Sequence, residues 1–156
     1  VFYCTVYGPD GSIKSQDIIP AKQLVTNEGL DHLLNVLLGG TTPVSPWYVG
    51  LKLTGAAAAA DTLASHAGWT ETTAYTGNRQ EYVEAAASGQ SVTNSANKAT
   101  FPMTGTATVY GAFLASAATG TSGTLLCVGD FAGAKSCTSG DTVEVTYTIS
   151  AADDGV

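Results

Sequence analysis

Residues 142–150 read TVEVTYTIS, in which threonine, glutamate or serine alternates with valine, tyrosine or isoleucine. Successive side chains of a β-strand point to opposite faces of a sheet, so this alternation predicts a strand with one buried face. Shorter segments of the same kind precede it, separated by turn residues at intervals of roughly eight to twelve residues. This spacing is typical of an antiparallel β-sandwich, so the sequence predicts a mainly β, jelly-roll-like fold.

The other segments predicted to be extended are spread over the whole chain. They are residues 1–7, 12–19, 47–53, 69–76, 81–85, 99–103, 107–116 and 124–131. Two polar or glycine-rich stretches, residues 88–97 and 133–139, are expected to form loops.

The length of 156 residues suits a single domain. Residues 1–19 are predicted to be a β-hairpin, because Pro9 and Gly11 supply a turn between two extended segments. We expect this hairpin to act as an arm that reaches a neighbouring subunit by strand addition or by packing. Residues 20–150 are expected to form the jelly-roll-like body, and the tail at residues 151–156 is expected to fray.

One amphipathic helix is predicted over residues 26–38. Its leucines share one stripe at helical spacing, and we expect that stripe to face the core. They are Leu30, Leu33, Leu34, Leu37 and Leu38. Thr26 or Asn27 is suited to cap the start of the helix, and two glycines follow its end. A short helical turn is predicted over residues 61–67, with Asp61 as its N-cap.

The composition excludes several classes of protein. Only 12% of residues are charged, the net charge is -7, and glycine, alanine, serine and threonine supply 75 of the 156 residues. With six cations and no basic cluster, the chain has no face suited to nucleic acid. No apolar run approaches the roughly 20 residues that span a membrane, and no signal peptide is visible, so we expect no membrane partner.

The chain offers few residues for metal or cofactor binding. It has no Cys-x-x-Cys, no His-Glu-x-x-His and no phosphate-binding glycine loop, so we expect no metal and no cofactor. The three cysteines are an odd number, which favours free buried thiols in a reducing cytosol. The alternative is that Cys127 and Cys137 face each other across a hairpin.

Two functional alternatives remain open from the residues alone. A hydrolase would use His66 with Asp61 or Glu71, but no nucleophile elbow is present, and we expect His66 to anchor a loop through ring hydrogen bonds. A sugar-binding face could be lined by aromatic side chains, which at strand spacing are more often core residues. These aromatic residues are Trp47, Tyr48, Trp69, Tyr75, Tyr82 and Tyr110.

Several short segments together resemble the small virion structural proteins of tailed bacteriophages, a group that includes capsid decoration (cement) proteins. The resemblance extends from about residue 25 to residue 149, and residues 61–79 are its most specific part. The segments are VTNEGL at 25–30, WYVGL at 47–51, DTLASHAGWTE at 61–71, YTGNR at 75–79, GD at 140–141 and VTYT at 145–148.

This resemblance implies a non-enzymatic protein on the capsid exterior that clamps copies of the major capsid protein and associates with itself as a homodimer or homotrimer. A tail- or fibre-associated module, with host glycan as its ligand, is the alternative. Arg79 is expected to make a structural ion pair or an interface contact; a solvent-exposed loop arginine is the alternative. The candidate structural or interface residues are Trp47, Tyr48, Asp61, His66, Trp69, Asn78 and Arg79.

Overall fold

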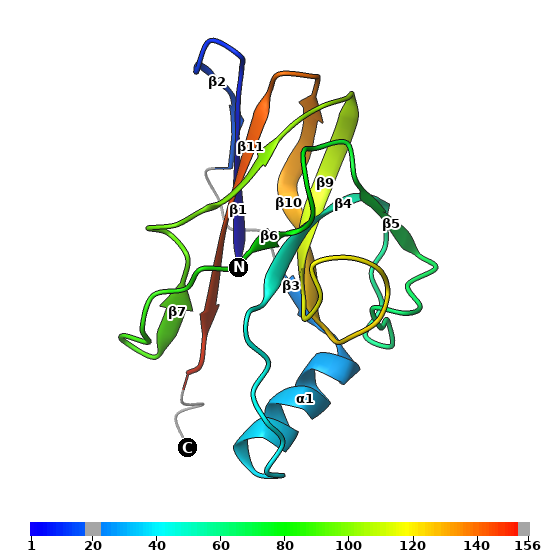
Figure 1. The fold of residues 1–156 in the computed structure, drawn as a ribbon, viewed down its shortest axis with the longest axis vertical. Helices are drawn as coiled ribbons and strands as arrows, with labels where there is room; N and C mark the ends of the chain where they lie inside the picture. Colours follow the sequence, from blue (N-terminus) through cyan, green and yellow to red (C-terminus); the bar gives the residue numbers. More distant parts are fainter. Residues whose placement is uncertain (18–22, 153–156) are drawn as a thin grey trace.

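The computed structural model describes residues 1–17 and 23–152, which form a sandwich of two antiparallel sheets with a single α-helix in this part of the chain (Figure 1). The first sheet holds β2 (Ile13–Gln16), β1 (Phe2–Tyr7), β11 (Thr142–Ser150), β7 (Ser91–Thr93) and β8 (Ala99–Pro102). The second holds β3 (Gln23–Val25), β10 (Leu125–Cys137), β9 (Ala107–Ala115), β4 (Tyr48–Gly55), β5 (Trp69–Thr72) and β6 (Gln80–Glu81). The predicted mainly β sandwich with one helix is confirmed.

The alternating strand β11 occupies the centre of the first sheet. Its Val143, Val145 and Tyr147 are fully buried between the two sheets. The Phe2 ring lies 4.5 Å from that of Tyr147, centroid to centroid, because the two residues are direct partners in the β1–β11 register. The interdigitated aromatic and branched side chains of the two inner faces thus form the main core.

The predicted N-terminal hairpin is present, but its first strand is not a free arm. β1 is hydrogen-bonded to β11 on one side and to β2 on the other. Only β2 therefore offers an edge for strand addition, and the contact of this hairpin with a neighbouring subunit stays a prediction. The predicted end of its second strand, residues 18–19, and residues 153–156 of the predicted frayed tail lie outside the described residues.

A second apolar cluster lies on the outer face of the second sheet, where residues 56–68 cover it. Its members are Leu63, Trp69, Phe113, Ala115, Leu125 and Val128. The helical turn predicted for residues 61–67 is wrong, because these residues form bends and turns. Thr62 and Ser65 exchange backbone hydrogen bonds, and the Asp61 carboxylate accepts from the Ala58 N–H instead of capping a helix. The closed loop is what allows Leu63 to reach the sheet.

Two loops predicted from polar composition contain strand. β10 runs through residues 133–137, with a register shift between Asp130 and Lys135. The buried Lys135 ammonium donates to Asp17 at 2.6 Å, and this contact holds the polar segment in the sheet. β7 similarly lies within the polar stretch 88–97.

The three cysteines are free and buried, as predicted. The alternative, in which Cys127 and Cys137 face each other across a hairpin, is wrong because both lie on β10. Burial raises the pKa of Cys127 and of Cys137 to about 11, so both thiols stay protonated at neutral pH.

Candidate interaction surface

The helix α1 (Asn27–Leu37) is fixed to the second sheet by its first turn. The Thr26 hydroxyl accepts a hydrogen bond from the Gly29 N–H at 3.0 Å and donates to the Leu125 carbonyl at 2.5 Å. Gly29 lies against the backbone of Leu126 in β10. A Cβ atom added to Gly29 would be only 2.2 Å from the Leu126 carbonyl oxygen. Only glycine allows the helix to approach β10 this closely.

Two further side chains fix the rotation of α1 about its axis. One oxygen of the Glu28 carboxylate accepts from the N–H of Leu125 at 2.7 Å and from that of Leu63 at 3.2 Å. On the next turn, the His32 ring meets the edge of Trp47, with centroids 5.4 Å apart. The helix therefore turns the side of Gly29 and His32 toward the sandwich.

This rotation places most of the predicted core stripe in solvent. Leu33 packs against the core, but Leu30, Leu34, Leu37 and Leu38 are 48%, 57%, 76% and 85% exposed. The helix is confirmed, while the expectation that its leucines face the core is wrong for these four residues, because the close contact at Gly29 takes the sheet-facing side. We call Leu30, Leu34, Leu37 and Leu38 the leucine face.

The leucine face is the largest group of neighbouring exposed apolar side chains in the described residues. The exposed fractions of its four side chains add up to more than two and a half fully exposed leucines. Removing this surface from water would stabilise an assembly by roughly 4–8 kcal/mol. The other large exposed apolar residues are spread over separate elements: Val1, Tyr3, Ile13, Val83 and Tyr110. In Figure 1, α1 lies at one end of the molecule, below the sandwich. A contiguous apolar patch in this position marks a contact surface.

The segment that sequence analysis singled out, residues 61–79, has a different role: it braces the outer cluster. Trp69 is buried and donates its indole N–H to the Asp61 carboxylate at 2.9 Å. The His66 ring stacks on Trp69 with centroids 4.1 Å apart, and its Nδ1 lies 3.2 Å from the Trp69 carbonyl oxygen. His66 thus anchors the loop, as expected from the sequence.

Arg79 makes the expected structural ion pair. Its guanidinium forms a two-pronged contact with Glu71, at 2.9 and 2.7 Å, and also donates to the carbonyls of Ala117 and Gly120. The group is buried and lies 5.1 Å from the Phe113 ring centroid. Arg79 therefore ties β5 to the loop after β9.

The remaining candidates are only partly available for contact. Trp47 and Tyr48 are half-buried at the start of β4, while Asn78 is exposed next to Arg79. Of the residues proposed for a hydrolase, Asp61 and His66 both bond Trp69, and Glu71 bonds Arg79. The exposure of the leucine face was not predicted from the sequence, because the same spacing of leucines also fits a buried stripe. Gly29, on the opposite side of the helix, was the residue that could have indicated which side faces the sheet.

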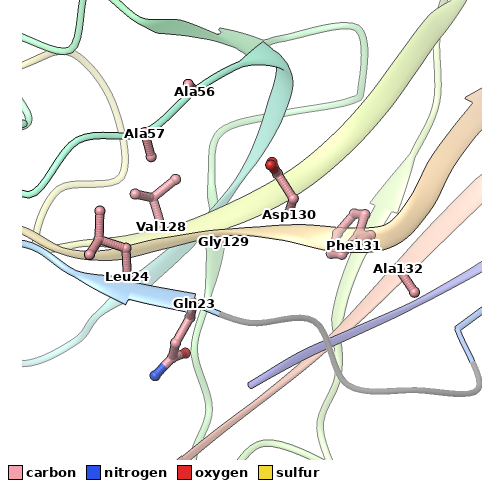
Figure 2. Close-up of a pocket in the computed structure, with 9 residues that line it drawn as sticks. All are labelled: Gln23, Leu24, Ala56, Ala57, Val128, Gly129, Asp130, Phe131 and Ala132. Atoms are coloured by element: carbon pink, nitrogen blue, oxygen red, sulfur yellow. The ribbon is translucent and has the colours of Figure 1, made fainter.

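A cavity of about 520 Å³ lies between β3, β10 and the loop after β4 (Figure 2). Small or apolar side chains form most of its wall, and Asp130 is its charged residue. One Asp130 oxygen accepts from the buried Lys52 ammonium at 2.6 Å, and Lys52 also donates to the Gly55 carbonyl. The charged groups at this cavity thus serve to hold β4 against β10.

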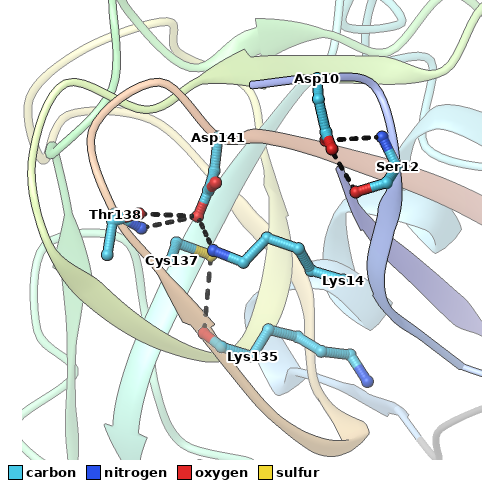
Figure 3. Close-up of polar contacts among 7 residues, drawn as sticks. All are labelled: Asp10, Ser12, Lys14, Lys135, Cys137, Thr138 and Asp141. Carbon is cyan, nitrogen blue, oxygen red and sulfur yellow. Dashed lines mark hydrogen bonds and ion pairs between the residues drawn. The ribbon is translucent and has the colours of Figure 1, made fainter. Parts of the chain in front are cut away.

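The buried carboxylate of Asp141 attaches the N-terminal hairpin (Figure 3). Lys14 of β2 donates to Asp141 at 2.5 Å, and the same oxygen accepts from the Thr138 N–H and hydroxyl. These hydrogen bonds hold the pKa of Asp141 below its ordinary value. In the same view, the Cys137 thiol points to the Lys135 carbonyl, 3.6 Å away.

Two features are absent from residues 1–17 and 23–152. No three or more His, Cys, Asp or Glu side chains gather there as a metal site would need. Nor does this part of the chain hold a helix whose length and apolarity suit a membrane crossing.

Comparison with known proteins identifies a family. A family model described as podophage GP4 fiber I protein gp80 matches residues 25–150. The matched region begins at the last residue of β3 and ends at the last residue of β11, so it includes α1 and leaves out β1 and β2. No curated protein matches the chain.

Proposed function

The chain belongs to the family of the podophage GP4 fiber I protein gp80 and is thus a phage virion structural protein; we propose that it is a non-enzymatic subunit of a virion fibre. The family description supports a fibre better than the capsid decoration expected from the sequence, where the major capsid protein would be the partner. In this proposal the protein acts through contacts with itself and with other virion proteins.

The observation that carries this proposal is the outward rotation of α1. Leaving the leucine face in water is unfavourable for an isolated subunit, and the close contact at Gly29 prevents the helix from turning it inward. An assembly that covers the leucine face is stabilised by the burial of these four side chains.

The charges of the molecule support the same conclusion. Five of the six cations form ion pairs within the described residues, namely Lys14, Lys52, Arg79, Lys98 and Lys135. Contacts with a partner therefore rest on apolar and hydroxyl groups. Because short side chains lose little rotamer freedom on burial, such a surface is well suited to assembly.

Locating the protein in intact particles tests the proposal. Electron cryomicroscopy of particles, compared with particles from a phage lacking the gene, should show the density of this subunit in fibres. Density distributed over the capsid shell would contradict a fibre role and would favour the hypothesis of a capsid decoration protein.

A groove on the outer face of the first sheet favours glycan adhesion as a second function. Tyr3, Thr5, Gln16, Lys98, Glu144 and Thr146 line a hollow of about 310 Å³, and the Tyr3 ring is 36% exposed. An exposed aromatic ring among hydroxyl and charged groups suits a sugar. Of the aromatic residues first considered for such a face, Trp69, Tyr75 and Tyr82 are buried.

Substitution of the exposed ring tests this second function. Tyr3→Ala should weaken binding of the purified protein to host cells at least tenfold if sugar stacks there. Tyr110→Ala is the matched control, because its ring is equally exposed, at 38%, on the other sheet. Equal binding by both variants would rule out the groove.

A further inference from the structure

We propose that the leucine face of α1 joins two copies of this chain across a two-fold axis, with Leu34 at the centre of the contact. This inference deepens the proposed function, because it names a second copy of the chain as the partner of the leucine face. It rests on the proposed function only in placing the dimer in a fibre.

The spacing of the leucine face suits contact with a second helix. Leu30, Leu34 and Leu37 follow one another at intervals of four and three residues, which is the spacing of core positions in paired helices. At about 100° per residue, the four leucines span an arc of only ~100°. The opposite side of α1 packs against the second sheet of the same chain. The leucine face is therefore wide enough for a narrow contact with one helix of a partner.

The distribution of apolar residues indicates that the face meets itself. The described residues hold no second apolar patch of similar size that could receive the leucine face of another copy. A contact between two identical leucine faces needs no second apolar surface and closes as a two-fold dimer.

The charges also favour a second copy over a basic partner. The helix α1 has no basic residue in its last turn, and its two acids are Glu28, whose carboxylate accepts two backbone N–H groups, and the exposed Asp31. Since each chain carries a net charge of -7, two copies approach most easily where the surface is mostly apolar.

The area available predicts a dimer of modest affinity. At about 100 Å² of apolar surface per leucine, the two leucine faces together supply about 500 Å², half of the roughly 1,000 Å² expected of a specific interface. The exposed residues 39–43, which directly follow α1, are placed to add to it. We expect association in the micromolar range, strengthened in a fibre by the neighbouring copies.

Sedimentation of the purified full chain between about 1 and 200 µM tests the proposal. The natural protein should pass from monomer to dimer, and Leu34→Asp should remain monomeric with at least a tenfold loss of affinity. Val83→Asp is the control, because Val83 is also an exposed apolar residue, at 42% against 57% for Leu34, and lies outside both α1 and the N-terminal hairpin. This variant should dimerise normally. If Leu34→Asp fails to fold, Leu37→Asp replaces it, since Leu37 is 76% exposed.

A charge-swap experiment shows whether the face meets itself. Leu34→Asp and Leu34→Lys should each be monomeric alone and should form a heterodimer when mixed, because residue 34 of one copy lies beside residue 34 of the other. The proposal would be overturned if the natural protein stayed monomeric or formed a trimer, or if Leu34→Asp associated as tightly as the natural protein. It would also be overturned if the mixed Leu34→Asp and Leu34→Lys proteins did not associate. None of these results would move the protein out of the fibre, so the two proposals fail separately.

Discussion

At the scale of single residues, Gly29 decides which side of α1 faces water. Its Cα lies where any side chain would collide with the Leu126 carbonyl oxygen, so the substitution Gly29→Ala must displace the helix from β10. We expect a loss of about 1–3 kcal/mol in the free energy of unfolding, measured by urea denaturation. Gly133→Ala is the control, because nothing lies within 4 Å of its added Cβ. An equal loss in both variants would refute the role of the close contact.

Residue-scale contacts also explain which candidate sites could be predicted. The anchoring role of His66 and the ion pair of Arg79 followed from residue type and local order, because both bond to nearby segments. The exposure of Leu34 could not be predicted in the same way. It depends on the approach of Gly29 to β10, which lies about 100 residues further along the chain.

At the scale of elements, the rotation of α1 separates two adjacent leucines. Leu33 packs against the core while Leu34 is exposed. Leu33→Ala should lower the free energy of unfolding by about 1–2 kcal/mol, since the side chain is only half-buried. Leu34→Ala should change it by less than about 0.5 kcal/mol. Urea denaturation of both variants at a protein concentration below dimerisation measures this, and the reverse order would contradict the rotation.

The β1–β2 hairpin is attached by a contact that depends on pH. Because hydrogen bonds lower the pKa of Asp141 in the folded protein, its contribution to stability is full above the unfolded value of about 3.9 and is lost as the pH falls through the folded pKa. Thermal unfolding should therefore show a steeper loss of stability below pH 4 in the natural protein than in Asp141→Asn. Parallel curves for the two proteins would contradict this assignment.

Elements were predictable from sequence where their pattern is local. The alternation in β11 and the leucine spacing of α1 identified a strand and a helix correctly. The segment at 61–67 was predicted as a helical turn because Asp61 looks like an N-cap, but Asp61 bonds to Trp69 and the loop closes over the sheet. β10 runs on through a glycine- and serine-containing segment, where the buried Lys135–Asp17 pair outweighs the local preference for a turn.

At the scale of the whole molecule, the sandwich pairs five of its cations with acids of its own chain and presents one helix outward. Small neutral residues make up almost half of the chain, and most cations pair with acids of the same chain. Such a subunit recognises its partners through shape and apolar contact. We therefore regard the leucine face as the surface by which this phage structural protein enters its assembly.

Incorporation into particles is the most direct test of that claim. A phage carrying Leu34→Asp and a phage carrying Val83→Asp should be compared with the natural phage for the amount of this protein in purified particles. We expect the Val83 variant to be incorporated normally and the Leu34 variant to be largely lost, although both proteins fold. Equal incorporation of the two variants would contradict the claim that the leucine face is an assembly surface.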